Sequence, residues 1–173
     1  MTLKGKNIYL RALEPLDLDF LYELENNPEI WEISGTITPY SKQVLRTYLE
    51  NAHRDIFDVK QLRLCICANS GKLVGLIDLF DFDPKNQRAG LGIVVLENED
   101  RNKGVGSEAI GLLDQYALKT LNLHQLYANV ASDNEASVHL FKKMGFEEVG
   151  VKKDWILSMG EYKNEILFQK INK

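Results

Sequence analysis

The chain has 173 residues, of which 45% are hydrophobic and 27% are charged, as is typical of a globular protein. Its 21 basic and 25 acidic residues give a formal net charge of −4, which argues against nucleic acid as a partner and mildly favours a cationic one. The length fits a single domain, residues 1–173, and no apolar stretch is long enough for a signal peptide or a membrane span. We therefore expect a cytoplasmic protein without a membrane partner.

The first quarter of the chain predicts a strand and two helices. Residues 7–13 alternate in the pattern of a strand, and Pro15 then opens a helix that Pro28 ends. A second helix begins near Ser41. The segment 26–35 is rich in turn-forming residues, so we expect an irregular connection there.

A meander of three strands is predicted next. Residues 61–68 and 73–83 form a hairpin around a three-residue turn, and the β-branched run 90–96 supplies the third strand. Cys65 and Cys67 lie on the same side of the first of these strands, a spacing that rarely forms a disulfide. We expect two buried, reduced thiols and no metal site.

A basic turn with two glycines lies between the third strand and an amphipathic helix. Its sequence is Arg101-Asn102-Lys103-Gly104-Val105-Gly106-Ser107. A helix start has unpaired N–H groups and a partial positive charge, and glycines let a ligand approach the backbone closely. The turn therefore predicts a phosphate or pyrophosphate site. The Gly-x-x-x-x-Gly-Lys-Ser/Thr pattern of a P-loop is absent, and a dinucleotide fingerprint fits poorly this far along the chain.

A second motif follows a predicted strand at 125–130. Asn134-Glu135-Ala136-Ser137-Val138-His139-Leu140-Phe141 forms a capped amphipathic helix that ends before Gly145. A closing hairpin, residues 147–157 and 161–169, completes the chain.

Together the two motifs resemble the GNAT superfamily of N-acetyltransferases. The turn is similar to its Arg-x-x-Gly-x-Gly pattern and the helix to its Asn-x-x-Ser-x-x-Leu-Phe signature. The resemblance covers essentially the whole chain and is strongest to the spermidine and diamine acetyltransferases and to the ribosomal-protein N-terminal acetyltransferases. It implies an α+β fold, with a mixed, mostly antiparallel sheet of about seven strands and helices on both faces.

The resemblance also implies an enzyme that transfers an acetyl group from acetyl-CoA to a primary amine. It places the acetyl-CoA contacts at Val94, Val95, Leu96, Arg101, Asn102, Lys103, Gly104, Val105, Gly106, Ser107, Asn134, Ser137 and Phe141. Many relatives carry a tyrosine acid where this chain has Phe141, and a phenyl ring has no proton to give. Ser137 stands where the ribosomal-protein branch has its proposed acid, so it is the candidate here.

Two acceptors remain open: a small polyamine or diamine, and the α-amine of a peptide N-terminus. The candidate acceptor-binding residues are Glu29, Trp31, Glu32, Asp78 and Asp81; Trp31 could instead anchor its loop to the core. Asp78 and Asp81 differ in strand parity, so they face one site only if a bulge intervenes. Asp154, Asp78 and Glu32 are candidate bases. The missing tyrosine leaves a non-catalytic acyl-CoA-binding protein as the alternative function, and the resemblance alone implies a homodimer.

Overall fold

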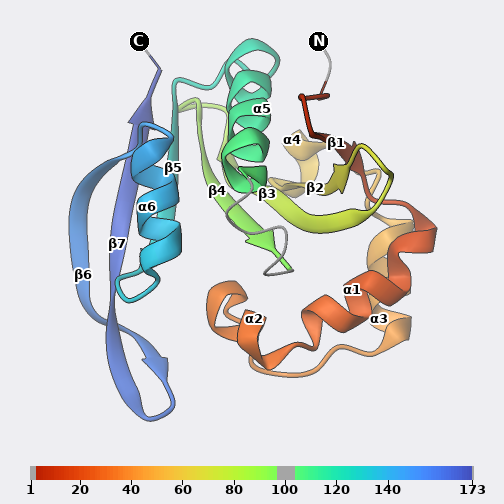
Figure 1. The fold of residues 1–173 in the computed structure, drawn as a ribbon, viewed down its shortest axis with the longest axis horizontal. Coiled ribbons are helices and arrows are strands. Elements are labelled where there is room, and N and C mark those ends of the chain that lie inside the picture. Colours follow the sequence, from red (N-terminus) through yellow and green to blue (C-terminus); the bar gives the residue numbers. More distant parts are fainter. Residues whose placement is uncertain (1–2, 97–103, 173) are drawn as a thin grey trace.

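The computed structural model describes residues 3–96 and 104–172, which form a seven-stranded sheet in the order β1-β2-β3-β4-β5-β7-β6 (Figure 1). The strands are β1 (Ile8–Ala12), β2 (Leu62–Ala68), β3 (Leu73–Asp83), β4 (Arg88–Val95), β5 (Gln125–Ala131), β6 (Glu147–Ser158) and β7 (Glu161–Ile171). Every neighbouring pair is antiparallel except β4 and β5. The expected mixed, mostly antiparallel sheet is thus confirmed.

Helices cover both faces of this sheet (Figure 1). In chain order they are the 3-10 turn η1 (Pro15–Asp17) and the α-helices α1 (Leu18–Glu25), α2 (Pro28–Ser34), α3 (Lys42–Glu50), α4 (Ile56–Val59), α5 (Val105–Lys119) and α6 (Glu135–Lys143). Helices α5 and α6 pack on one face, and α1 to α3 lie over the other. No helix in residues 3–96 or 104–172 is long and apolar enough to cross a bilayer.

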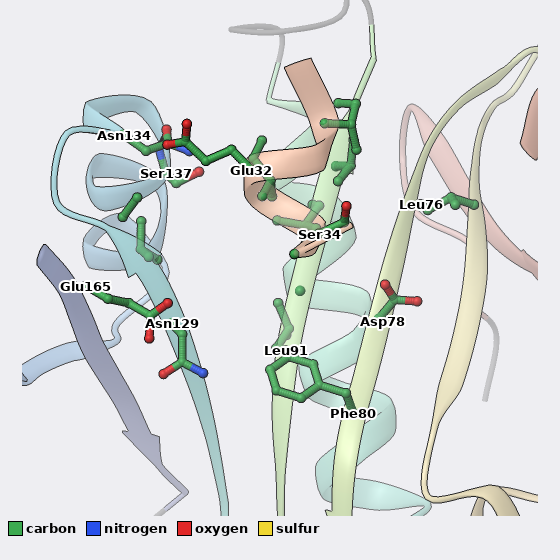
Figure 2. Close-up of a pocket in the computed structure, with 18 of the residues that line it drawn as sticks. Glu32, Ser34, Leu76, Asp78, Phe80, Leu91, Asn129, Asn134, Ser137 and Glu165 are labelled. Atoms are coloured by element: carbon green, nitrogen blue, oxygen red, sulfur yellow. Dashed lines mark hydrogen bonds between the residues drawn. The ribbon is translucent and has the colours of Figure 1, made fainter. Parts of the chain in front are cut away.

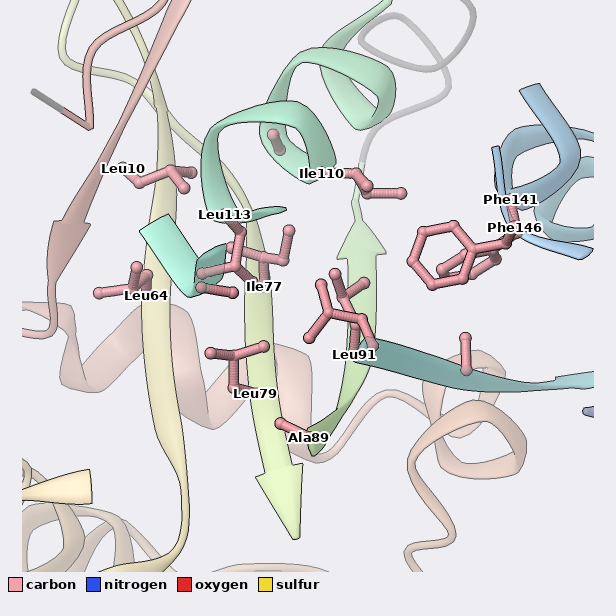
Figure 3. Packing of buried hydrophobic residues seen from close by; sticks show 14 of the residues in the cluster. Leu10, Leu64, Ile77, Leu79, Ala89, Leu91, Ile110, Leu113, Phe141 and Phe146 are labelled. Atoms are coloured by element: carbon pink, nitrogen blue, oxygen red, sulfur yellow. The ribbon is translucent and has the colours of Figure 1, made fainter. Parts of the chain in front are cut away.

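Alternation along β3 divides its side chains between the two faces. Ile77 and Leu79 are fully buried in the main core, to which α5 also contributes, and Ile77 lies beside Leu113 (Figure 3). Leu76 belongs to the smaller core beneath α1 and α3, and Asp78 shares its parity. One face of β3 therefore builds the main core, while the other supplies a polar side chain beneath the first helices.

Two short helices differ from the expectation. Pro28 does not merely end a helix: it is the first residue of α2, whose N-cap Asn27 accepts the backbone N–H of Glu29 at 3.0 Å. Proline is well suited to a first helical turn because its missing N–H would have no helical partner there. Helix α4 is capped in the same way by Asp55 and was not predicted.

The sheet opens between β4 and β5. These strands pair only at Arg88 with Gln125, Ala89 with Leu126, and Gly90 with Tyr127. β4 remains paired with β3 as far as Val95, and β5 with β7 as far as Ala131. A gap therefore separates residues 91–95 from residues 128–131, at the end of the sheet where α5 and α6 begin.

Candidate active site

A cavity of about 720 Å³ lies where β4 meets the starts of α5 and α6. It is named here the glycine cavity, and its lining is Ile30, Ile33, Ile93, Val94, Val95, Gly104, Gly106, Ser107, Asn134, Ala136, Ser137, His139, Leu140 and Lys143. Of the predicted acetyl-CoA contacts, the structure gathers Val94, Val95, Gly104, Gly106, Ser107, Asn134 and Ser137 around this space. Arg101, Asn102 and Lys103 lie outside the described residues.

The two glycines of the cavity hold the start of α5 in an unusual geometry. Gly104 is the N-cap with φ of +81°, a left-handed conformation that glycine adopts without strain. A Cβ on Gly106 would lie 3.0 Å from a methyl carbon of Leu140, so glycine lets α5 approach α6 closely. The first N–H groups of a fifteen-residue helix thus begin at the cavity wall, which suits an anionic group.

Asn134 and Ser137 lie at the N-terminal end of α6, as Gly104 and Gly106 do in α5. The Asn134 side chain caps the helix by accepting the backbone N–H of Ser137 at 3.1 Å. Within the described part of the chain, the Ser137 hydroxyl has no hydrogen-bond partner. Both residues are half-buried, so this hydroxyl can bind a ligand without breaking an existing bond.

The other predicted donor-side residues are part of the packing. Phe141 is 3% exposed; its ring lies edge-on to Phe146 at 5.1 Å between centroids and stacks on Phe168 at 6.1 Å. It forms part of a cavity wall but has no polar group to offer. Val105 is 8% exposed in the main core, and Leu96 packs in the smaller core.

A second cavity, of about 600 Å³, adjoins the first and shares six of its residues: Ile30, Ile33, Ile93, Val94, Asn134 and Ser137. Four carboxylates line it, those of Glu25, Glu32, Asp78 and Glu165, so it is named here the acidic cavity. Figure 2 shows three of them, Glu32, Asp78 and Glu165. Its floor includes Gly92, where an added Cβ would have its nearest contact at 3.8 Å. The two cavities meet at Ser137 and Asn134, so ligands in each would lie end to end.

Arg63 of β2 holds two of the four carboxylates. It donates from Nε to Asp78 at 2.7 Å and from Nη1 to Glu25 at 2.9 Å, and its guanidinium lies 5.8 Å from the Tyr48 ring. Burial alone would lower the pKa of Arg63, but the charge of Asp78 and its hydrogen bond raise it overall. This buried cation fixes both carboxylates in place.

Glu32 of α2 forms hydrogen bonds to β6 and β7, on the opposite side of the cavity from Arg63. It accepts from Lys163 of β7 at 2.7 Å and from the Ser158 hydroxyl, and Lys163 also contacts Asp133 at 2.8 Å. Hydrogen bonds from Lys163 lower the pKa of Glu32 and, separately, that of Asp133. We call this Glu32–Lys163–Asp133 contact the α2 latch, because α2 forms the roof over both cavities.

Glu165 was not among the predicted site residues. It lies opposite Lys152 across the β6–β7 pairing and forms an ion pair with it, while Lys152 also donates to Asn129 at 3.4 Å. Figure 2 shows Glu165 and Asn129 on the wall facing Asp78. A polar residue at 129 between buried Ala128 and Val130 was a usable signal in the sequence, since alternation places it on the opposite face.

Several acceptor-side candidates lie away from both cavities. Trp31 donates its indole N–H to the carbonyl of Glu25 at 2.7 Å and so anchors α2 to α1. Glu29 is exposed at the start of α2. Asp81 is exposed beside a bulge of β3 and accepts from the Tyr127 hydroxyl at 3.4 Å. Asp154, a candidate base, is also absent from either lining.

Comparison with known proteins agrees with this arrangement. A family model of the acetyltransferase (GNAT) domain matches residues 7–147. The spermidine N(1)-acetyltransferase of Vibrio cholerae is 31% identical over 160 residues, which cover 92% of this chain and 90% of that protein. The crystal structure of Vibrio cholerae spermidine N-acetyltransferase in complex with CoA and spermine has a TM-score of 0.86 and 27% identity, and covers 96% of each chain. A dodecameric structure of spermidine N-acetyltransferase from the same organism has a TM-score of 0.79 and 28% identity, and covers 96% of this chain and 95% of that one.

An open sheet with a helix-start cavity and an adjoining acidic cavity has room for two ligands placed end to end. The chain belongs to the GNAT acetyltransferase family. It is an acetyl-CoA-dependent N-acetyltransferase that acts on an amine. The expected fold class, enzyme class and co-substrate are therefore confirmed, and the non-catalytic alternative is not favoured, because the named relatives are enzymes.

Proposed function

We propose that this enzyme acetylates a small polyamine such as spermidine. The observation that carries the proposal is the set of four carboxylates that line the acidic cavity; Arg63 is the cation within that lining, and Lys163 and Lys152 pair with Glu32 and Glu165. A polyamine carries several ammonium groups joined by short methylene chains, which suits carboxylates on opposite walls. The similar proteins named for spermidine support the same acceptor.

The glycine cavity would hold acetyl-CoA. The start of α5 at Gly104 and Gly106 would receive the pyrophosphate, and the gap beside Val94 and Val95 would receive the pantetheine arm. When bound, acetyl-CoA would supply the acetyl thioester: attack by the neutral amine would form the C–N bond as the C–S bond breaks, with the nitrogen losing a proton to water and the departing thiolate taking one up. The reacting atoms then belong where the cavities meet, beside Ser137 and Asn134.

Ser137 would serve the leaving thiolate. Its hydroxyl is unpartnered among the described residues and lies in the shared wall of both cavities. A serine hydroxyl is a weak acid, so we assign it a hydrogen bond to the thiolate or to a water that delivers the proton. Phe141, buried among two other phenylalanines, cannot take this part.

The test is release of free CoA thiol from acetyl-CoA with spermidine, a diamine, and a short peptide bearing a free α-amine. We expect turnover on spermidine and the diamine, and little on the peptide. Ser137→Ala should lower kcat by about 10- to 100-fold with little change in the KM for spermidine. Ser132→Ala, an exposed serine outside both cavities, is the matched control. Turnover confined to the peptide would replace the polyamine with an N-terminal α-amine.

We also propose that the chain forms a homo-oligomer. The dodecamer of the similar Vibrio cholerae enzyme supports self-association. Light scattering of the purified protein measures it directly, and a monomer at working concentration would refute it.

A further inference from the structure

A tryptophan that the sequence pattern did not single out lies at the wall of the acidic cavity. Trp155 of β6 lines the cavity and is 60% exposed. A large apolar area of its indole is therefore in contact with solvent. Its neighbour Ile156 lines the same cavity. Adjacent residues of a regular strand point to opposite faces, so the backbone must be irregular here.

A bulge in β6 causes this arrangement. Lys152 pairs with Glu165 and Ile156 pairs with Lys163, so three residues of β6 stand opposite the single residue Asn164 of β7. Asp154 has φ of +49°, and its N–H is held by the Asn164 side chain at 3.0 Å. Such bulges re-aim side chains beside functional sites. This one turns the indole toward the cavity.

The indole already holds one ammonium group. The Nζ atom of Lys152 lies 4.6 Å from the centroid of the Trp155 ring. Glu165 and Asn129 bind the same lysine, so its ammonium is already neutralised by a carboxylate. Because the ring is 60% exposed and lines the cavity, part of its surface remains open to a second cation.

We propose that Trp155 binds the distal part of the acceptor, an ammonium group and its neighbouring methylenes, and so favours polyamines and diamines over monoamines. This inference rests on the proposed polyamine function. An aromatic face attracts an ammonium and also covers apolar methylenes, so it suits both parts of such a chain. The carboxylates of the cavity then bind the ammonium groups of the acceptor, and Trp155 favours acceptors long enough to reach its ring.

The experiment compares Trp155→Ala and Trp155→Phe with the native enzyme. We expect Trp155→Ala to raise the KM for spermidine by about 2- to 30-fold, the range of one cation–π contact, with the KM for acetyl-CoA unchanged. Trp155→Phe should retain most of the binding. The KM for butylamine, which has no distal ammonium, should not change. Leu157→Ala is the matched control, because Leu157 is 62% exposed on the same strand and does not line the cavity.

A second readout separates this inference from the proposed function. The chain has two tryptophans, so the fluorescence of the native protein minus that of Trp155→Phe reports on Trp155 alone. Spermidine should change this difference signal, with or without turnover. Native turnover on spermidine with unchanged KM in Trp155→Ala, or equal losses for spermidine and butylamine, would overturn the inference and leave the function standing. Absence of turnover on every polyamine would overturn the proposed function. If spermidine also left the difference in fluorescence unchanged, the inference about Trp155 would be overturned as well.

Discussion

Replacing Arg63 with methionine tests whether the paired carboxylates of the acidic cavity are held by a buried cation. The side chains of Arg63, Glu25 and Asp78 are 21%, 11% and 20% exposed, so removal of the guanidinium leaves two largely buried carboxylates without a partner. Breaking a buried pair in this way costs about 3 to 5 kcal/mol, and the partial exposure favours the lower end. With a urea m-value of about 2 kcal/mol/M, the midpoint of unfolding should fall by about 1.5 M.

Arg54→Met is the matched control for Arg63→Met. Arg54 lies just before α4 and pairs with Asp58, four residues along the chain, and these side chains are 50% and 59% exposed. Its loss should change the free energy of unfolding by about 0.5 kcal/mol or less. Spermidine should raise the midpoint of Arg63→Met more than that of the native protein, because the freed carboxylates can bind its ammonium groups. If Arg63→Met and Arg54→Met lower the urea midpoint by the same small amount, Arg63 does not stabilise the two carboxylates in the way described.

Three further outcomes are expected. Gly75→Ala should cost about 2 kcal/mol or more in urea unfolding, because the new Cβ would lie 2.2 Å from a backbone oxygen of β4, whereas Gly92→Ala should cost little; equal midpoints would contradict the packing. Lys163→Gln should speed amide exchange in α2 at pH 7. The latch carboxylates have lowered pKa values, so this difference from the native protein should persist above about pH 4 and fade below it; a difference unchanged at pH 3 would exclude the latch. Burial raises the pKa of Cys65 to about 12, so a thiol reagent at pH 8 should label it only on unfolding, and rapid labelling of native protein would show that burial does not protect it.

Local patterns were enough to predict most elements, including the helix start at Gly104 and the cap of α6 at Asn134. The alternation that buries Ile77 and Leu79 while turning Asp78 to the other face is visible in the sequence. The left-handed Gly145 after α6, with φ of +81°, follows from glycine's own preference. These features depend on residues near one another in the chain, which is why periodicity and capping residues reveal them.

The acidic cavity depends on contacts that the sequence does not encode locally. Glu165 reaches the cavity because β7 lies between β5 and β6, an order fixed by long-range pairing. Trp155 reaches it through a bulge that breaks strand alternation, so a regular pattern assigns it to the wrong face. Pro28 shows a local ambiguity: proline both ends one helix and begins another, and only the packing of Ile30 in the core decides which.

The gap between β4 and β5 has a mechanical consequence. Among residues 3–96 and 104–172, three residue pairs join the β1–β4 half of the sheet to the β5–β7 half, fewer than in any other neighbouring pair of strands. A ligand that lies in the gap would contact both halves of the sheet and so restrict their motion relative to one another. Acetyl-CoA should therefore slow amide exchange on both sides of the gap at once.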